Sequence, residues 1–359
     1  MKKYFLAVAS FFIYSHISLG QVYPGQMDST FVPVRSHHYD PELTFDFCVN
    51  EPAWSNQAGI HSAFGSTDRL YFRKEVPVNH DNDLSSSYST TVWRGERANA
   101  QILVWSSEAL EQVRVSTQDL RSAEGNIIPK DRITFELVRY VLSNYPYAEK
   151  KAICGESPYK SGFLMPDRFE TLDRFDLPSQ TTRPVWMMVD VPRGTAPGTY
   201  KGKVEVRAKG KAPQLLNLEI VVQNQLLPYP KDWKYRLDLW QNPWAVAWYN
   251  HVEPWSPEHK MLLKQHLKHY ADAGGTYITS YGVHSPWSDN SYMIEGGMIE
   301  WIKKADGTWA FDYKIFDEYV ELAMECGIDE AITLYTPIPW GFRHRYKDEA
   351  TGDYSYINW

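Results

Sequence analysis

The sequence predicts a β-sandwich followed by the first part of a (β/α)8 barrel of the TIM type, truncated at the C-terminus. Between residues 31 and 224, short strand patterns alternate with turn residues, which is typical of a sandwich. Residues 226–232 contain two prolines, which make a stiff connector. Beyond this connector the hydrophobic period changes from two to about 3.6, which indicates helices between strands. We therefore expect a sandwich domain at 21–228 and a partial catalytic barrel at 229–359.

Residues 1–20 are typical of a secretory signal peptide. Two lysines form the positive end, residues 5–14 form the apolar centre, and Ser18-Leu19-Gly20 is a small-residue cleavage site. We expect the mature protein to begin near Gln21 and to be exported, to the periplasm or outside the cell. No later segment is long and apolar enough for a membrane span.

The composition narrows the possible functions. The formal net charge is -7 without a strongly basic block, which argues against a nucleic-acid partner. Aromatic residues make up 15% of the chain, and their faces suit sugar rings as well as protein cores. Cys48 and Cys154 are the only cysteine pair within one domain, and Cys326 is the third cysteine. Export permits a disulfide between that pair, while buried free thiols are an equally good expectation.

The strands of the sandwich domain are predicted from local patterns. Residues 203–207 alternate strictly between polar and apolar, as a half-exposed strand does. Pro197-Gly198 indicates a turn, and the polar, Ser-rich residues 81–89 indicate a surface loop. The predicted strand segments are 91–93, 100–105, 133–142, 186–191, 203–207 and 215–222.

The barrel part has the order strand, helix, strand, helix, strand. Residues 235–244 form a short buried strand with a polar and aromatic end. Ser256-Pro257-Glu258 starts the first helix, because it supplies an N-cap, a proline in the first turn and an acid near the positive end of the helix dipole. Gly274-Gly275 ends this helix, and residues 276–281 form the second strand.

The second helix is expected to begin near Asp312 and to end at Gly327, with the third strand at 331–335. Residues 292–311 lie between the second strand and this helix. They contain Ala305-Asp306-Gly307-Thr308, a hairpin-type turn between short apolar runs. A barrel would use such an insertion to shape its mouth.

Polar and aromatic side chains lie at the C-terminal ends of all three predicted barrel strands. In a barrel these ends meet at one mouth. Aromatic faces can hold a sugar ring while polar groups bind its hydroxyls. For any single residue, closing the open end of the core is an equally good explanation, but the set favours a sugar site. The candidate substrate-binding residues are Asp238, Trp240, Gln241, Tyr281, Trp287, Tyr335 and Trp340, with His284 close by.

Two other clusters are weaker candidates. Asp348-Glu349 is an adjacent pair of carboxylates, but it lies in a hydrophilic segment at 345–353, and such charge runs are usually solvated. His259, His266 and His269 fall near one face of the first helix, where neighbouring lysines favour a solvated face over a metal site. We therefore expect no metal site, and the sequence contains no phosphate-binding loop or His-Glu-x-x-His motif.

Several segments resemble glycoside hydrolase family 123 and its close relatives. Residues 236–247, which include Arg236-Leu237-Asp238-Leu239-Trp240-Gln241-Asn242-Pro243-Trp244, resemble the opening of the family's catalytic domain. The resemblance covers nearly all of the mature chain. The other similar segments are 303–309, 312–317 and Tyr335 with Pro339-Trp340 in the catalytic domain, and 93–97, 100–101 and 197–202 in the N-terminal sandwich.

The resemblance implies an exo-acting β-N-acetylgalactosaminidase or a related hexosaminidase-like hydrolase. Its substrate would be a glycan with a terminal β-linked N-acetylgalactosamine. Such enzymes retain anomeric configuration because the substrate's 2-acetamido oxygen attacks the anomeric carbon. In the family an adjacent Asp-Glu pair assists, with Asp orienting the acetamido group and Glu acting as general acid/base. No cofactor or metal is expected.

The catalytic pair of the family follows a strand downstream of all the segments matched here, so we expect it beyond Trp359. An eight-fold barrel takes about 250 residues, whereas residues 231–359 number 129. We therefore expect a natural truncation or a fragment that is inactive alone and whose C-terminal half folds poorly. The alternatives are a non-catalytic carbohydrate-binding surface protein and a structural surface module.

Overall fold

The computed structural model describes residues 27–28, 31–32, 42–43, 51–77, 84–143, 163–283, 297–335, 338 and 342–358. The chain divides into two compact units, Met1–Leu227 and Pro228–Trp359. The expected signal peptide, Cys48 and Cys154 lie outside the described residues. Cys326 is a buried free thiol. In the part of the chain that is described, no helix combines the length and the hydrophobicity needed to cross a bilayer.

Unit 1 is mostly β-strand and holds two large sheets. The first sheet has the strand order β11 (Phe163–Thr171), β10 (Ile133–Ser143), β13 (Thr181–Asp190), β6 (Arg97–Ser106) and β4 (His61–Gly65). The second has the order β2 (Phe31–Val32), β12 (Arg174–Leu177), β7 (Leu110–Thr117), β14 (Gly198–Arg207), β15 (Gln214–Leu226) and β5 (Ser87–Arg94). The short elements are β1 (Met27–Asp28), β3 (Glu42–Leu43), β8 (Leu120–Arg121), β9 (Ile127–Ile128), η1 (Glu51–Trp54) and η2 (Lys130–Arg132).

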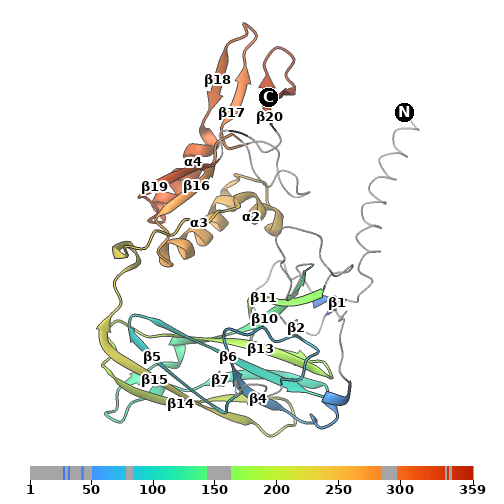
Figure 1. Cartoon of the computed structure of the whole chain (residues 1–359), viewed down its shortest axis with the longest axis vertical. Helices are drawn as coiled ribbons and strands as arrows, with labels where there is room; N and C mark the ends of the chain where they lie inside the picture. The colour runs from blue at the N-terminus through green and yellow to red at the C-terminus, as the bar shows by residue number, and fades with distance from the viewer. Residues whose placement is uncertain are drawn as a thin grey trace, which may run out of the picture. The chain divides into compact units, whose positions relative to one another are not determined.

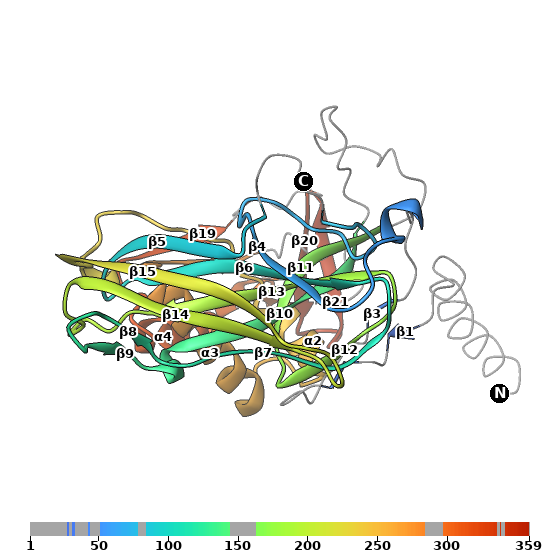
Figure 2. The ribbon, with the colours of Figure 1, turned by 90° about the horizontal axis from the view of Figure 1, so that it is seen from below.

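The two large sheets share one hydrophobic core. Ile102 and Val104 of β6 belong to the same buried cluster as Val204 of β14 and Ile220 of β15. Figures 1 and 2 show the two sheets as stacked layers. In β14 the buried residues alternate with more exposed ones, because successive side chains of a strand point to opposite faces of the sheet. The arrangement is that of two sheets packed face to face.

Each of the six predicted strand segments overlaps a strand, and these strands are β5, β6, β10, β13, β14 and β15. The prediction of a loop was wrong at residues 87–89. These serine-rich residues open β5, which pairs in parallel with β15. The pairing supplies backbone hydrogen bonds that local composition does not reveal. The strands β4, β7, β11 and β12 were not predicted.

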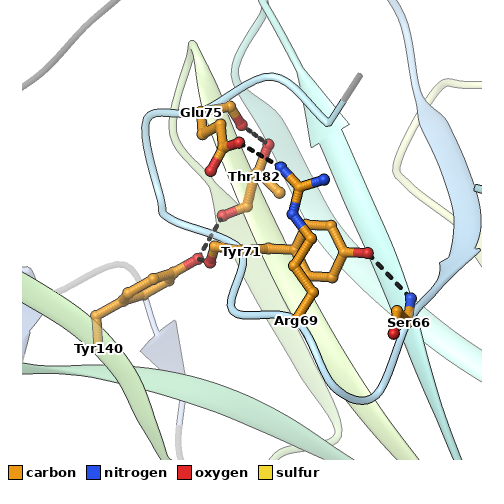
Figure 3. Close-up of polar contacts among 6 residues, drawn as sticks. All are labelled: Ser66, Arg69, Tyr71, Glu75, Tyr140 and Thr182. Carbon is orange, nitrogen blue, oxygen red and sulfur yellow. Dashed lines mark hydrogen bonds and ion pairs between the residues drawn. The ribbon is translucent and has the colours of Figure 1, made fainter. Parts of the chain in front are cut away.

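The loop after β4 is attached to the first sheet by side-chain hydrogen bonds (Figure 3). The Tyr140 hydroxyl donates to the Tyr71 carbonyl at 2.7 Å, and the Thr182 hydroxyl donates to the Glu75 carbonyl at 2.6 Å. Arg69 forms an ion pair with Glu75 at 2.8 Å. The two hydroxyl contacts satisfy backbone carbonyls of the loop, which is the requirement for placing a loop against a buried surface.

Unit 2 contains three parallel segments separated by helices. Leu237 forms a single parallel bridge with Gly275, and β16 (Tyr277–Tyr281) pairs in parallel with β19 (Ala331–Tyr335). Between them run α3 (Pro257–Asp272) and α4 (Lys314–Glu325). The predicted order of strand, helix, strand, helix, strand is therefore present except at its first member, where the structure has a single bridge at Leu237. The other elements are η3 (Pro230–Asp232), α2 (Pro243–Asn250), β17 (Glu300–Lys303), β18 (Trp309–Asp312), β20 (Arg343–Asp348) and β21 (Tyr354–Asn358).

The first predicted strand of unit 2 is not a regular strand. Only Leu237 pairs, and Pro243 already begins α2. The hydroxyl of Tyr270 explains the difference. It lies 2.7 Å from the Leu237 carbonyl and 2.8 Å from the Tyr277 carbonyl, and it accepts a hydrogen bond from the Leu239 amide at 3.3 Å. A side chain from α3 thus takes the place of most of the backbone ladder.

The predicted helix starts and stops of unit 2 are confirmed. Ser256 caps α3, because its hydroxyl accepts a hydrogen bond from the His259 amide at 3.2 Å. Gly274, with φ at +90°, follows α3, and Gly327, with φ at +92°, follows α4. The third strand matches its predicted bounds.

A four-stranded sheet has the order β18, β17, β20, β21. The predicted hairpin joins β17 to β18, and its turn is closed by Asp306, which accepts hydrogen bonds from the Thr308 amide and hydroxyl. The prediction of a hydrophilic loop at 345–353 was wrong for its first part, which belongs to β20. Arg345 lies 4.1 Å over the Tyr354 ring of β21, so the polar sequence is stabilised by cross-strand cation–π contact.

Candidate functional site

Asp238 connects the three parallel segments of unit 2. Its Oδ1 accepts a hydrogen bond from the Thr279 hydroxyl of β16 at 2.8 Å, and its Oδ2 accepts one from the Thr333 hydroxyl of β19 at 2.7 Å. Thr279 and Thr333 are register partners, so their side chains lie on the same face of the sheet. The carboxylate is therefore held by one donor from each neighbouring strand.

Aromatic rings lie two residues further along the same strands. Tyr281 and Tyr335 are again register partners, and their ring centroids are 6.0 Å apart. Trp240 packs edge-on against Tyr335 at 4.5 Å between centroids. The hydroxyl of Tyr281 donates to the main-chain carbonyl of Gln241. We call Asp238, Trp240, Gln241, Tyr281 and Tyr335 the strand-end cluster.

The members of the strand-end cluster differ in their accessibility. Asp238 is exposed and Trp240 is 50% exposed, so both can reach a ligand. Tyr281 is fully buried, so it packs against the other members of the cluster and does not reach solvent. The Gln241 side-chain amide donates to the Leu239 carbonyl at 3.3 Å. The structure thus brings five of the seven predicted site residues together, while Trp287 and Trp340, like His284, lie outside the described residues.

Thr279 and Thr333 were missed by the sequence reasoning. A signal was present, because the second and third strands share the pattern Ile-Thr-x-Tyr, at 278–281 and 332–335. The repeated threonine marks the position that faces Asp238, and the repeated tyrosine marks the aromatic layer beyond it.

An exposed carboxylate beside an exposed indole can bind a polar ring with one apolar face. Two hydroxyl donors fix Asp238, and its remaining lone pairs are free to accept hydrogen bonds from ligand hydroxyls. The half-exposed ring of Trp240 offers an apolar face next to it. Burial raises the pKa of Tyr270, and the nearby Asp238 carboxylate adds to this rise, so the phenol stays a neutral donor beneath the site.

His259 is not on a solvated face, contrary to the prediction. It is fully buried; its Nδ1 accepts a hydrogen bond from the Trp255 amide, and its Nε2 lies 2.8 Å from the Pro243 carbonyl. Burial lowers the pKa of His259, partly offset by the bond to Pro243. The ring therefore joins the start of α2 to the start of α3. Within the described residues no group of three His, Cys, Asp or Glu side chains is placed to hold a metal ion.

The adjacent carboxylates Asp348 and Glu349 are engaged by backbone amides. Asp348 accepts from the Ala350 amide at 3.0 Å, and Glu349 accepts from the Ala305 amide at 3.2 Å. These are the contacts of residues that close turns at the end of the four-stranded sheet.

Two family models match the chain in the order of its two units. The glycoside hydrolase 123 N-terminal domain matches residues 64–208, and the glycoside hydrolase 123 catalytic domain matches residues 240–359. The chain belongs to glycoside hydrolase family 123. Four of the five residues of the strand-end cluster lie within the catalytic-domain match, and Asp238 lies two residues before it.

One solved structure shares the fold of most of the chain. A family 123 glycoside hydrolase from Clostridium perfringens, described in a study of glycolipid glycan hydrolysis, has a TM-score of 0.73 and 24% identity, covering 84% of this chain and 52% of its own. The chain described here thus spans about half the length of the Clostridium perfringens protein. A PapD-like domain of human CEP192 has a TM-score of 0.25 and 12% identity, covering 52% of this chain and 99% of its own. No curated protein matches the sequence.

Proposed function

We propose that the protein containing this chain is an exported exo-β-N-acetylgalactosaminidase acting on glycans with a terminal β-linked N-acetylgalactosamine. The strand-end cluster carries the proposal, because it places an exposed carboxylate and an exposed indole beside the parallel strands β16 and β19 in a family 123 chain. The signal-like residues 1–20 support export.

The proposed architecture is a sandwich at 21–228 and a (β/α)8 catalytic domain that begins at 229. In such a barrel the C-terminal ends of the strands form the active-site mouth. The parallel order of the Leu237 segment, β16 and β19 supports this placement.

The proposed mechanism retains configuration with the help of the substrate. The 2-acetamido oxygen attacks the anomeric carbon, and an adjacent Asp-Glu pair orients that group and transfers the proton. We place this pair beyond Trp359. The strand-end cluster then has a binding role: Trp240 packs on the sugar ring and Asp238 accepts hydrogen bonds from its hydroxyls. This scheme needs neither a metal nor a cofactor.

The test is hydrolysis by the full-length gene product. The purified protein would be assayed with the p-nitrophenyl β-glycosides of N-acetylgalactosamine, N-acetylglucosamine and galactose. Cleavage of the first, with none of the galactoside, is expected if the acetamido group takes part in the reaction. Trp240→Ala should raise KM, because it removes the proposed stacking surface.

Binding of N-acetylgalactosamine without cleavage would instead favour a carbohydrate-binding surface protein. If a folded protein neither cleaved nor bound any of the three sugars, the proposed function would be wrong.

A further inference from the structure

Unit 2 has a cavity away from the strand-end cluster. It is a cavity of about 480 Å³ between the first turns of α3 and α4 and the four-stranded sheet. We call it the α3–α4 cavity. Its lining includes Glu253, Trp255, Lys260, Trp301, Lys314 and Glu318. Its volume falls in the range of about 300–1,000 Å³ typical of small-molecule sites.

The α3–α4 cavity and the strand-end cluster have no residue in common. Trp244 lines the cavity and packs on Tyr281 with 5.6 Å between ring centroids. Tyr281 in turn packs on Tyr335 of the strand-end cluster. The two sites are therefore neighbours that are connected through a layer of buried aromatic rings.

Two tryptophans form firm walls of the cavity. Trp255 packs edge-on against Trp244 and Tyr319, at 5.8 and 6.0 Å between centroids. Trp301 packs against Phe311 at 5.0 Å and against His344 at 4.2 Å. Because neighbouring rings hold each indole in place, a ligand would meet preformed apolar surfaces and would lose little entropy in ordering them.

The charged groups of the cavity are nearly balanced and mostly paired. Lys260 forms an ion pair with Glu318 at 3.2 Å, and the Tyr354 hydroxyl donates to Glu300 at 2.5 Å. The exposed side chains of Glu253 and Lys314 make no hydrogen bond or ion pair with the described residues. The Glu253 carboxylate and the Lys314 ammonium thus remain available to a ligand. Four carboxylates against three cations on the lining give no strong preference for an anion or a cation.

We propose that the α3–α4 cavity binds a neutral sugar unit, separately from the strand-end cluster. The sugar's apolar face would pack on Trp255 or Trp301, its hydroxyls would donate to Glu253, and its oxygens would accept from Lys314. The proposal requires binding only, so it can hold whether or not the strand-end cluster lies in a hydrolytic site.

The test measures sugar binding to the full-length protein by isothermal titration calorimetry. The probes are methyl β-galactoside and methyl N-acetyl-β-galactosaminide. Three variants separate the sites: Trp240→Ala for the strand-end cluster, Glu253→Gln with Lys314→Met for the cavity, and Glu321→Gln with Lys304→Met as a matched control. Glu321 and Lys304 are exposed and do not line the cavity.

We expect Trp240→Ala and the control pair to keep a binding site for at least one probe. The cavity pair should weaken that binding about tenfold or more, since it removes both polar contacts. An unfolding temperature equal to that of the wild type would verify that the double variant Glu253→Gln with Lys314→Met is folded. If the double variant is not folded, the single variant Lys314→Met is tested in its place, because Lys314 is exposed.

Loss of all binding in Trp240→Ala, or binding that the cavity variants leave unchanged, would overturn the proposal. A protein that hydrolyses no glycoside but still binds a probe through Glu253 and Lys314 would reject the proposed function and keep the cavity site.

Discussion

At the scale of single residues, Asp238 shows how a site carboxylate is fixed. Thr279 is fully buried and donates to it, whereas Thr333 donates from the neighbouring strand. A hydrogen bond to a charged group contributes about 1.5–3 kcal/mol, and less where water competes for the carboxylate. Because Asp238 is exposed, we place its contribution to stability at the lower end of this range.

Asp238→Ala should lower the free energy of unfolding by about 1–2 kcal/mol, because it leaves the buried Thr279 hydroxyl without its acceptor. Urea denaturation of the full-length protein measures the change. Thr279→Val in the Asp238→Ala background should then cost clearly less than Thr279→Val alone. Fully additive effects of the two substitutions would contradict the contact.

His259 makes a pH-dependent contribution to stability. Its pKa in the folded protein is lowered below the unfolded value of about 6.5. The folded state therefore disfavours the proton that the unfolded chain takes up. This stability is fully present above about pH 6.5 and is lost as the pH falls towards the folded pKa.

We expect His259→Phe to have a smaller loss of stability between pH 7.5 and pH 5 than the wild type. Guanidinium unfolding at the two pH values gives the comparison. Gln265→Ala is the control, because Gln265 lies on the same helix, is exposed and carries no titratable group, and it should keep the wild-type dependence. An unchanged pH dependence in His259→Phe would reject the assignment.

At the scale of elements, Tyr270 of α3 joins the Leu237 segment to β16. Gly275 makes this possible, because a Cβ at that position would lie 2.3 Å from the Tyr270 ring. The ring cannot move away without breaking the hydrogen bonds of its hydroxyl with the Leu237 and Tyr277 carbonyls. The missing side chain of one glycine thus allows the close approach of helix and strand.

Gly275→Ala should destabilise unit 2 by about 1–3 kcal/mol, the usual cost of overpacking. Gly194→Ala is the control, since a Cβ there has no neighbour within 4 Å. Thermal unfolding should show a clear decrease for the first and a change of only a few tenths of a kcal/mol for the second. Equal effects of the two would contradict the role of the Tyr270 ring.

At the scale of the whole molecule, each unit has its own core. The core of unit 1 includes Ile102 and Val204, and the core of unit 2 includes Leu267 and Ile278. Since the two clusters have no residue in common, the free energies of unfolding of the two units should respond to different substitutions.

Ile102→Ala removes a fully buried side chain and should lower the stability of unit 1 by about 2–5 kcal/mol. Calorimetry of the full-length protein should show that Ile102→Ala and Gly275→Ala shift two different unfolding transitions. A single transition shifted equally by both substitutions would show that the units unfold as one.

The sequence alone determined the elements whose signals are local. The caps at Ser256 and Gly274, the hairpin turn at Asp306, and the third strand all follow from short-range chemistry, and each was predicted where it lies. The position of Tyr335 at the end of the third strand was also predicted, because the end of this strand is visible in the hydrophobic pattern.

Only the tertiary structure decided the contacts between distant segments. The loop prediction was wrong at residues 87–89, because pairing with β15 makes these serine-rich residues a strand. The predicted first strand of unit 2 is absent, because hydrogen bonds of the Tyr270 hydroxyl take the place of most backbone hydrogen bonds between strands. The repeated Ile-Thr-x-Tyr pattern marks Thr279 and Thr333 as equivalent positions, but only the tertiary structure shows that both donate to Asp238. Burial of the His259 ring likewise has no local signal. Hydrogen bonds and burial of this kind depend on which segments are brought together, and no local pattern encodes the partner.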